Sequence, residues 1–302
     1  MTIFAVIVTF NPQMRYFERL LTSICSQVDG IVVVDNASNS GLVGQIVKGY
    51  ESVVFVALDE NLGIAAALNI GFDYAISLGA DYVITLDQDS VLETNLVKSL
   101  LSAYLELIHM GYNPSVVGSR YRDISNGEIS DNLKFTYFRT RPVHDPLVLG
   151  RLVPVDFVIT SGSFLSLEVY NQVGPMREEL FIDHVDTEWV LRASHAGFQS
   201  YSLQSPCINH SLGEFRKRVW FGRWRNIPFH KPFRYYYIFR NAILVMKQEN
   251  ISKKWKIMET QRMIKMAIFM CIMSPERLAI LRYMMKGVVH GLRGIGGKLR
   301  EN

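Results

Sequence analysis

Two aspartates lie one residue apart where an apolar segment ends, because Asp87-Gln88-Asp89 follows the run of residues 82–86. Carboxylate oxygens suit Mg²⁺ or Mn²⁺, which take their remaining ligands from water and from a substrate diphosphate. Successive residues of an extended segment point to opposite faces, so the two carboxylates reach one site only if a turn begins here. We therefore expect a turn with a divalent metal site; the alternative is an ordinary solvated turn.

A further carboxylate, Asp35, ends the apolar run of residues 31–34 and precedes Asn36-Ala37-Ser38. An acidic side chain at a strand end can accept hydrogen bonds from a nucleotide base or a ribose hydroxyl. The alternative is a turn that these polar side chains hold by themselves.

The third acidic group is the segment of residues 181–192, in which Asp186 is placed to begin a helix. Asp186 could cap that helix, or it could take the proton of an attacking hydroxyl as a general base. His210 follows a predicted strand. A lone histidine is usually a packing or surface residue, but an imidazole near the acidic pair could complete the shell of a metal ion.

Short β-branched runs alternate with amphipathic stretches of helical length over the first 120 residues. The predicted strands are residues 3–8, 30–34, 53–57 and 82–86, and the predicted helices are residues 14–27, 41–50, 64–78 and 92–111. This alternation predicts an α/β fold with a mostly parallel central sheet. Ligands bind beyond the carboxyl ends of such strands, and this is where the acidic residues lie.

The net charge of +4 conceals a basic tail. Residues 211–302 hold 20 of the 32 Lys and Arg residues but 5 of the 28 Asp and Glu residues. Residues 214–240 interleave cations with aromatics, a mixture that suits single-stranded nucleic acid or a phosphate-bearing lipid. No upstream segment resembles a nucleic-acid module, so we expect an anionic membrane surface and no nucleic acid.

The uncharged run of residues 266–275 is too short to span a bilayer. It predicts an interfacial helix, with packing on the core or on a second copy in a homo-oligomer as the alternative. Three scattered cysteines and an N-terminus without a basic segment favour a cytoplasmic protein rather than a secreted one.

Several of these segments together resemble the family 2 glycosyltransferases of the GT-A fold, a Rossmann-like fold for nucleotide-diphospho-sugar transferases. The matching segments, in order, are Ala5-Val6-Ile7-Val8-Thr9-Phe10-Asn11-Pro12, Val33-Val34-Asp35-Asn36-Ala37-Ser38, Asn61-Leu62-Gly63-Ile64-Ala65-Ala66-Ala67-Leu68-Asn69, Asp87-Gln88-Asp89 and Val185-Asp186-Thr187-Glu188-Trp189-Val190-Leu191-Arg192. Their spelling is most similar to the bacterial rhamnosyltransferases of O-antigen and surface-polysaccharide assembly. The resemblance implies a GT-A domain at residues 1–240 and a helical, basic extension at residues 241–302.

The resemblance also implies roles for particular residues. The nucleotide would be bound by Thr9, Asn11, Pro12, Asp35, Asn61, Gly63 and Asp87, and the metal, Mg²⁺ or Mn²⁺, by Asp87, Asp89 and His210. Asp186 would be the catalytic base, although the first acid of the family's Glu-Asp-x-Asp motif is Val185 here. Asp183 and Glu188 are therefore kept as supporting candidates.

The implied activity is inverting transfer of L-rhamnose from dTDP-rhamnose to a lipid-diphosphate-linked saccharide at the inner face of a bacterial plasma membrane. The Gln-x-x-Arg-Trp signature, typical of the polymerising members of the family, is missing, and Phe221-Gly222-Arg223-Trp224 matches it only in part. Its absence favours addition of a single sugar. The alternatives are another donor, such as UDP-galactofuranose or a UDP-N-acetylhexosamine, a sugar nucleotidyltransferase, and a carbohydrate-binding module without activity.

Overall fold

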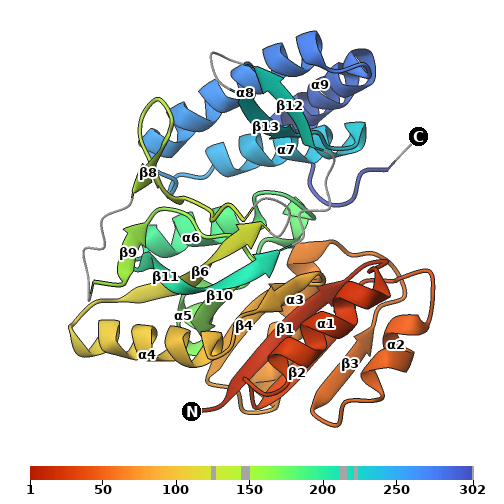
Figure 1. Ribbon diagram of the computed structural model, residues 1–302. Helices are drawn as coiled ribbons and strands as arrows, with labels where there is room; N and C mark the ends of the chain where they lie inside the picture. Colours follow the sequence, from red (N-terminus) through yellow and green to blue (C-terminus); the bar gives the residue numbers. More distant parts are fainter. Residues whose placement is uncertain (124–126, 144–149, 211–215, 221–223, 301–302) are drawn as a thin grey trace.

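The computed structural model describes residues 1–123, 127–143, 150–210, 216–220 and 224–300. Its main sheet has the strand order β3-β2-β1-β4-β10-β6-β11-β5, with β9 paired to β11 (Figure 1). The strands of this sheet are β1 (Ile3–Thr9), β2 (Gly30–Asp35), β3 (Val53–Ala57), β4 (Tyr82–Asp87), β5 (Ser90–Leu92), β6 (Pro114–Asp123), β9 (Leu152–Val155), β10 (Ser163–Ser166) and β11 (Gln199–His210). The neighbours β3, β2, β1 and β4 are all parallel, which confirms the predicted α/β class with a mostly parallel centre.

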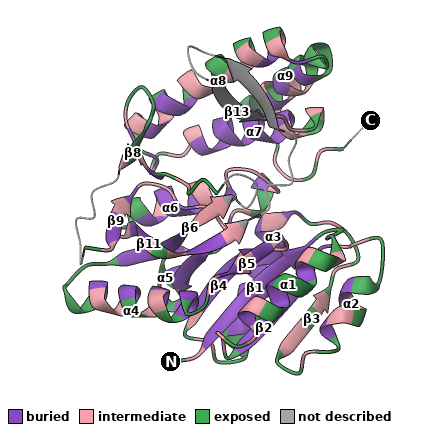
Figure 2. Ribbon diagram, in the orientation of Figure 1, coloured by how far each residue is buried: buried purple, intermediate pink, exposed green. Residues whose placement is uncertain are grey.

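Helices cover both faces of the sheet. The helices are α1 (Met14–Ile24), α2 (Leu42–Val47), α3 (Ile64–Ser77), α4 (Leu96–His109), α5 (Leu167–Val173) and α6 (Val185–His195), with a short 3₁₀ turn at Glu178–Leu180. Alternate residues of β1 enter opposite cores: Ala5 and Ile7 pack with α1 and α4, and Val6 and Val8 pack with α3 and α6. The central strands are therefore buried on both sides, as their continuous apolar runs predict (Figure 2).

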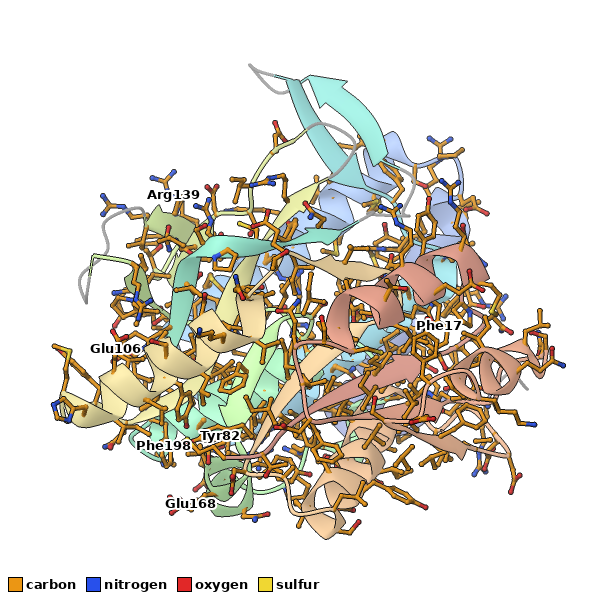
Figure 3. The ribbon with its side chains drawn as sticks, turned by 60° about the horizontal axis from the view of Figure 1, so that its bottom comes forward. Phe17, Tyr82, Glu106, Arg139, Glu168 and Phe198 are labelled. Carbon is orange, nitrogen blue, oxygen red and sulfur yellow. The ribbon has the colours of Figure 1, made fainter. Side chains whose placement is uncertain are left out.

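Aromatic side chains fill the core where β4 meets the antiparallel part of the sheet. Tyr82, labelled in Figure 3, stacks on Phe164 with ring centroids 5.4 Å apart, and Tyr104 of α4 packs edge-on against Tyr82 at 5.5 Å. These contacts join β4, β10 and α4 near the start of β4, and the antiparallel pairing of Ser163 with Thr85 continues this joint toward the end of β4 that carries the acidic pair.

One predicted helix begins later than expected. Residues 92–111 were expected to be helical, but Ser90–Leu92 forms strand β5 and the helix begins at Leu96. The cause is a distant partner, because β5 pairs antiparallel with the end of β11. This pairing takes precedence over the local helical pattern of the chain.

Three helices of the C-terminal part form a further layer above the sheet (Figure 1). They are α7 (Pro232–Met246), α8 (Lys253–Met273) and α9 (Arg277–Arg293), which pack around a small apolar core of their own. Two short hairpins, β7 (Asn132–Phe135) with β8 (Thr140–Val143) and β12 (Arg216–Trp220) with β13 (Trp224–Pro228), complete the described elements. None of the described helices is both long and apolar enough to cross a bilayer.

The C-terminal helices share a core with the sheet domain. Trp255 and Met258 of α8 belong to the same buried cluster as Val185 and Trp189 of α6. The predicted boundary between residues 240 and 241 falls inside α7. The division into two domains remains a prediction. The contacts between α8 and α6 cross the predicted boundary, and α6 carries Asp186.

Candidate active site

The acidic pair lies on a turn at the carboxyl end of β4. Asp87 is the last residue of β4, and residues 88 and 89 form a turn before β5 begins at Ser90. The turn is anchored on both sides: the backbone N–H of Phe10 donates to Gln88 Oε1 at 2.8 Å, and the N–H of Asp87 donates to Ser161 Oγ at 3.2 Å. This is the turn that two carboxylates need to serve one site.

Asp35 lies at the end of β2, beside the end of β1, and only 7% of it is exposed. Its Oδ1 accepts hydrogen bonds from Thr9 Oγ1 at 2.7 Å and Ser38 Oγ at 2.6 Å, and its Oδ2 accepts one from the Ser38 N–H at 3.1 Å. Thr9 is fully buried, so it supports Asp35 from below. A carboxylate has about four acceptor positions, so Oδ2 retains capacity for a donor on a nucleotide base.

Asn11 and Pro12 follow β1 on the same edge. The Asn11 N–H donates to Ser38 Oγ at 2.8 Å, and Asn11 Oδ1 accepts from the Asn39 N–H at 2.8 Å. Pro12 is buried under this loop. The two loops after β1 and β2 therefore form one hydrogen-bonded unit around Asp35.

The loop before α3 closes against these two loops. Asn36 Nδ2 donates to Asn61 Oδ1 at 3.1 Å, and Asn36 Oδ1 accepts from the Leu62 N–H at 2.8 Å. Gly63 has φ +89°, and a Cβ built on it would lie 2.5 Å from Phe181. Only glycine allows this conformation and this approach. The loop therefore joins Asp35 to the segment that precedes Asp186.

Asp186 is the second residue of α6, and the N-cap of that helix is His184. The alternative of an N-cap role for Asp186 is therefore wrong. Its Oδ1 accepts from the Thr187 N–H at 2.7 Å, and its Oδ2 accepts from Thr160 Oγ1 at 3.2 Å. Burial raises the pKa of Asp186, and these two hydrogen bonds offset part of that effect. A carboxylate whose pKa is raised by burial is a better proton acceptor, as a general base requires.

The two supporting acids of the segment are engaged elsewhere. Glu188 is fully buried and forms an ion pair with Arg192 at 3.1 Å. Asp183 forms an ion pair with Arg234 of α7 at 3.1 Å. Of the three acids, Asp186 has hydrogen bonds from Thr160 and Thr187 rather than an ion pair within the described residues.

Two site residues were missed from the sequence, Thr160 and Ser161. Thr160 donates to Asp186, while Ser161 Oγ accepts from the Asp87 N–H and lies 2.7 Å from Ser90 Oγ. They connect the acidic turn to the proposed base. The available signal was the small-residue patch Thr160-Ser161-Gly162-Ser163 after an apolar run, which has no recognisable chemistry by itself.

The third predicted metal ligand, His210, ends β11, and its backbone pairs with Ser90 next to the acidic turn. Its side chain lies outside the described residues, as do the side chains of residues 216–228 in the cation-aromatic segment. Within the described part of the chain, no group of three or more His, Cys, Asp or Glu side chains could hold a metal unaided. Asp87 and Asp89 still fit Mg²⁺ or Mn²⁺, because such ions commonly take further ligands from water and substrate phosphates.

Comparison with known proteins shows the family of this chain. Residues 4–164 match the family model Glycosyl transferase family 2. The chain is 32% identical over 304 residues to the dTDP-rhamnosyl transferase RfbF of Shigella flexneri, an alignment that covers 99% of this chain and 98% of that protein. The chain therefore belongs to glycosyl transferase family 2, and it is a glycosyltransferase.

Solved structures show the same fold at low identity. The TarS 1-349 structure of S. aureus in complex with UDP-GlcNAc has a TM-score of 0.62 and 14% identity, and the match covers 98% of this chain and 82% of that one. GalNAc-T7 with UDP, GalNAc and Mn²⁺ has a TM-score of 0.63 and 15% identity, with 97% and 57% covered. The fold is thus the predicted GT-A fold.

Proposed function

We propose that this glycosyltransferase transfers L-rhamnose from dTDP-rhamnose, with inversion, to a lipid-diphosphate-linked saccharide in surface-polysaccharide assembly. The observation that carries the donor is the end-to-end similarity to a dTDP-rhamnosyl transferase at 32% identity. The match covers 99% of this chain, so it includes both the strand ends around Asp35, which we call the nucleotide edge, and the segment around Asp186.

The nucleotide edge supports the binding of a nucleoside diphosphate. Asp35 can accept from the base, and the loop of Asn61 and Gly63 closes beside it. Asp87 and Asp89 would hold Mg²⁺ or Mn²⁺, and GalNAc-T7 was solved with UDP and Mn²⁺. When bound, such an ion neutralises negative charge on the diphosphate as it leaves.

Asp186 supports the inverting step. Its carboxylate accepts the proton of the acceptor hydroxyl as that oxygen forms a bond to the anomeric carbon, while the bond from that carbon to the diphosphate oxygen breaks. Attack from the face opposite the leaving group inverts the anomeric centre. Thr160 and the Thr187 N–H hold the carboxylate, so that little reorganisation is needed.

A hollow of about 520 Å³ between the β7–β8 loop and the C-terminal helices supports a phosphate-bearing acceptor. It is lined by the cations Arg139, Arg262 and Lys265, and by Phe138, Tyr235 and Phe269. Arg139 is labelled on its loop in Figure 3. Guanidinium and ammonium groups bind phosphate, and aromatic rings pack on sugar or lipid.

The outer helices support attachment at a membrane surface. Ile257, Ile264, Ile268 and Ile272 of α8 are between 44% and 68% exposed, and the helical repeat places them on one side. On α9, the residues Leu278, Leu281, Met285, Val289 and Leu292 form a second exposed row. Lys265, Arg282 and Lys286 lie on the same helices, and exposed apolar rows among cations are typical of interfacial helices. A homo-oligomer contact is the alternative use of these rows.

The donor is tested by calorimetric titration of dTDP-rhamnose, UDP-galactofuranose and UDP-N-acetylglucosamine, each with and without Mn²⁺. We expect dTDP-rhamnose to bind most tightly, and only with the metal, because Asp87 and Asp89 otherwise repel the diphosphate. Asp89→Ala should lose the metal enhancement. Tighter binding of a UDP-sugar would refute the donor, and unchanged enhancement in Asp89→Ala would refute the metal assignment.

A further inference from the structure

The turn that leads into α6 has an unusual backbone. Phe181, Asp183 and His184 have φ values of +64°, +64° and +63°. Side chains with a Cβ disfavour this left-handed region, so the surrounding structure must hold the turn in place. Asp186 follows His184 by two residues. The direction in which its carboxylate points therefore depends on residues 181–184.

Helix α7 holds the carbonyl groups of this turn. Asn241 Nδ2 lies within hydrogen-bond distance of the carbonyl oxygens of Leu180 (2.8 Å), Ile182 (2.7 Å) and Asp183 (2.9 Å). Arg240 Nε donates to Asn241 Oδ1 at 2.8 Å and so fixes which end of the amide faces the turn. Both side chains are fully buried. A single amide thus contacts the carbonyl just before the turn, at Leu180, and two carbonyls within it, at Ile182 and Asp183.

Helix α8 holds the side chain at the end of the turn. Glu259, whose side chain is 3% exposed, lies 3.4 Å from His184 Nε2 and accepts from Arg262 Nε at 2.8 Å. Burial raises the pKa of Glu259, but the hydrogen bonds from His184 and Arg262 outweigh burial and lower it to about 2. The carboxylate is therefore ionised at neutral pH and attracts Arg262, whose Nη2 lies 3.3 Å from His184 Nε2, so that Glu259 and Arg262 hold His184 together.

We propose that α7 and α8 hold the turn of residues 181–184 and thereby aim Asp186 at the acceptor hydroxyl, with Asn241 and Glu259 as positioning residues. The proposal rests on the role of Asp186 as the base, given above. Reacting atoms must be held to a fraction of an ångström, because a misplacement of about 1 Å can cost about 100-fold in rate. The C-terminal helices thus serve the chemistry as well as any contact with a membrane.

Two variants test this proposal. Glu259→Gln keeps the shape of the side chain but removes the charge that faces His184, and Asn241→Asp places a carboxylate oxygen against three carbonyl oxygens. We expect kcat to fall about 10- to 100-fold in each, with the donor KM and calorimetric Kd within about twofold of wild type. Full kcat in both variants would overturn the proposal.

A matched control separates positioning from loss of stability. Ile280 of α9 is buried among the C-terminal helices and lies in a different cluster from the turn. Ile280→Ala should lower the melting temperature at least as much as Glu259→Gln, yet keep kcat within about twofold. An equal loss of kcat in Ile280→Ala would mean that general destabilisation explains the result, and the proposal would be wrong.

Double variants show whether the two residues act through Asp186. If they do, adding Glu259→Gln to Asp186→Asn should reduce kcat by less than about twofold beyond Asp186→Asn alone, since the misplaced group is already inactive. A full multiplication of the two losses would overturn the proposal. Normal turnover of Asp186→Asn alone is a different outcome, because it would refute the base and with it the proposed mechanism.

Discussion

The side chain of Asp186 is half-buried, and its carboxylate accepts hydrogen bonds from Thr160 and Thr187. Asp186→Asn keeps the size of the side chain and removes the base. We expect kcat to fall by about 10²- to 10⁴-fold. The melting temperature should stay near or above that of the wild type, because the neutral amide avoids the cost of burying a charge. Steady-state kinetics and thermal melts test this together.

Glu188→Gln is the control for this prediction. Glu188 is paired with Arg192 in the interior, so its loss should lower the melting temperature and leave most of the turnover of the folded enzyme. A larger loss of kcat in Glu188→Gln than in Asp186→Asn would move the base two residues along the helix.

The pH dependence of the reaction follows from the same burial. A raised pKa means that the proton stays on Asp186 to a higher pH than on an ordinary aspartate, whose pKa is 3.8. Because the base must be unprotonated, kcat/KM should fall on the acid side with a midpoint above 3.8. The residual activity of Asp186→Asn should not show this decrease of kcat/KM at acid pH. A wild-type midpoint at or below the ordinary value would contradict the assignment.

At the scale of elements, the loop before α3 must approach the turn before α6 closely. Gly63→Ala strains a backbone with φ +89° and ψ 166°, and it drives a Cβ into Phe181. The strain costs about 1–3 kcal/mol in a region that only glycine favours. We expect a lower melting temperature and weaker donor binding by calorimetry, since Asn61 lies on the same loop.

Gly79→Ala is a matched control for the backbone strain. Gly79 has φ +80°, but a Cβ there would meet no atom within 4 Å. The variant should therefore lose some stability and bind the donor as the wild type does. Equal effects on donor binding in the two variants would show that the contact with Phe181 does not shape the nucleotide edge.

At the scale of the whole molecule, exposed apolar residues and basic residues gather on α8 and α9, which lie at the top of Figure 2. Replacing Ile264, Ile268 and Ile272 together by Ser removes an apolar row whose members are 55%, 58% and 68% exposed. We expect binding to vesicles with anionic lipids to fall at least tenfold, while donor binding persists. High salt should weaken attachment further, since each Lys or Arg near an anionic surface contributes about 1 kcal/mol.

The control for this prediction removes exposed apolar side chains at the end of α4, away from α8 and α9. Ile108 and Met110 at the end of α4 are 50% and 51% exposed. Replacing both by Ser should leave vesicle binding intact. Equal loss in both proteins, or no binding of the wild type at low salt, would refute the membrane proposal. In that case, a change of oligomeric state in the α8 variant would support a homo-oligomer contact through these isoleucines.

The sequence alone was enough to predict the parallel strands, their order of appearance and the residues at their carboxyl ends. Asp35, Asp87 and Asp186 could be predicted as site residues because each lies next to a local pattern, an apolar run or a helix start, and such patterns depend on neighbouring residues. Residue 86 was the last of a predicted strand, and the structure extends that strand by one residue before the expected turn.

Tertiary structure decided which groups surround those residues. Three partners of Asp186 and its turn, Thr160, Asn241 and Glu259, lie 26 or more residues away along the chain. Strand β5 (Ser90–Leu92) takes the first residue of a predicted helix, because β11 pairs with it. Helical and strand periodicity report which face of an element is apolar, but they carry no information about which distant element packs on that face. The contacts that we propose to aim Asp186 depend on that packing, so they became visible only in the folded chain.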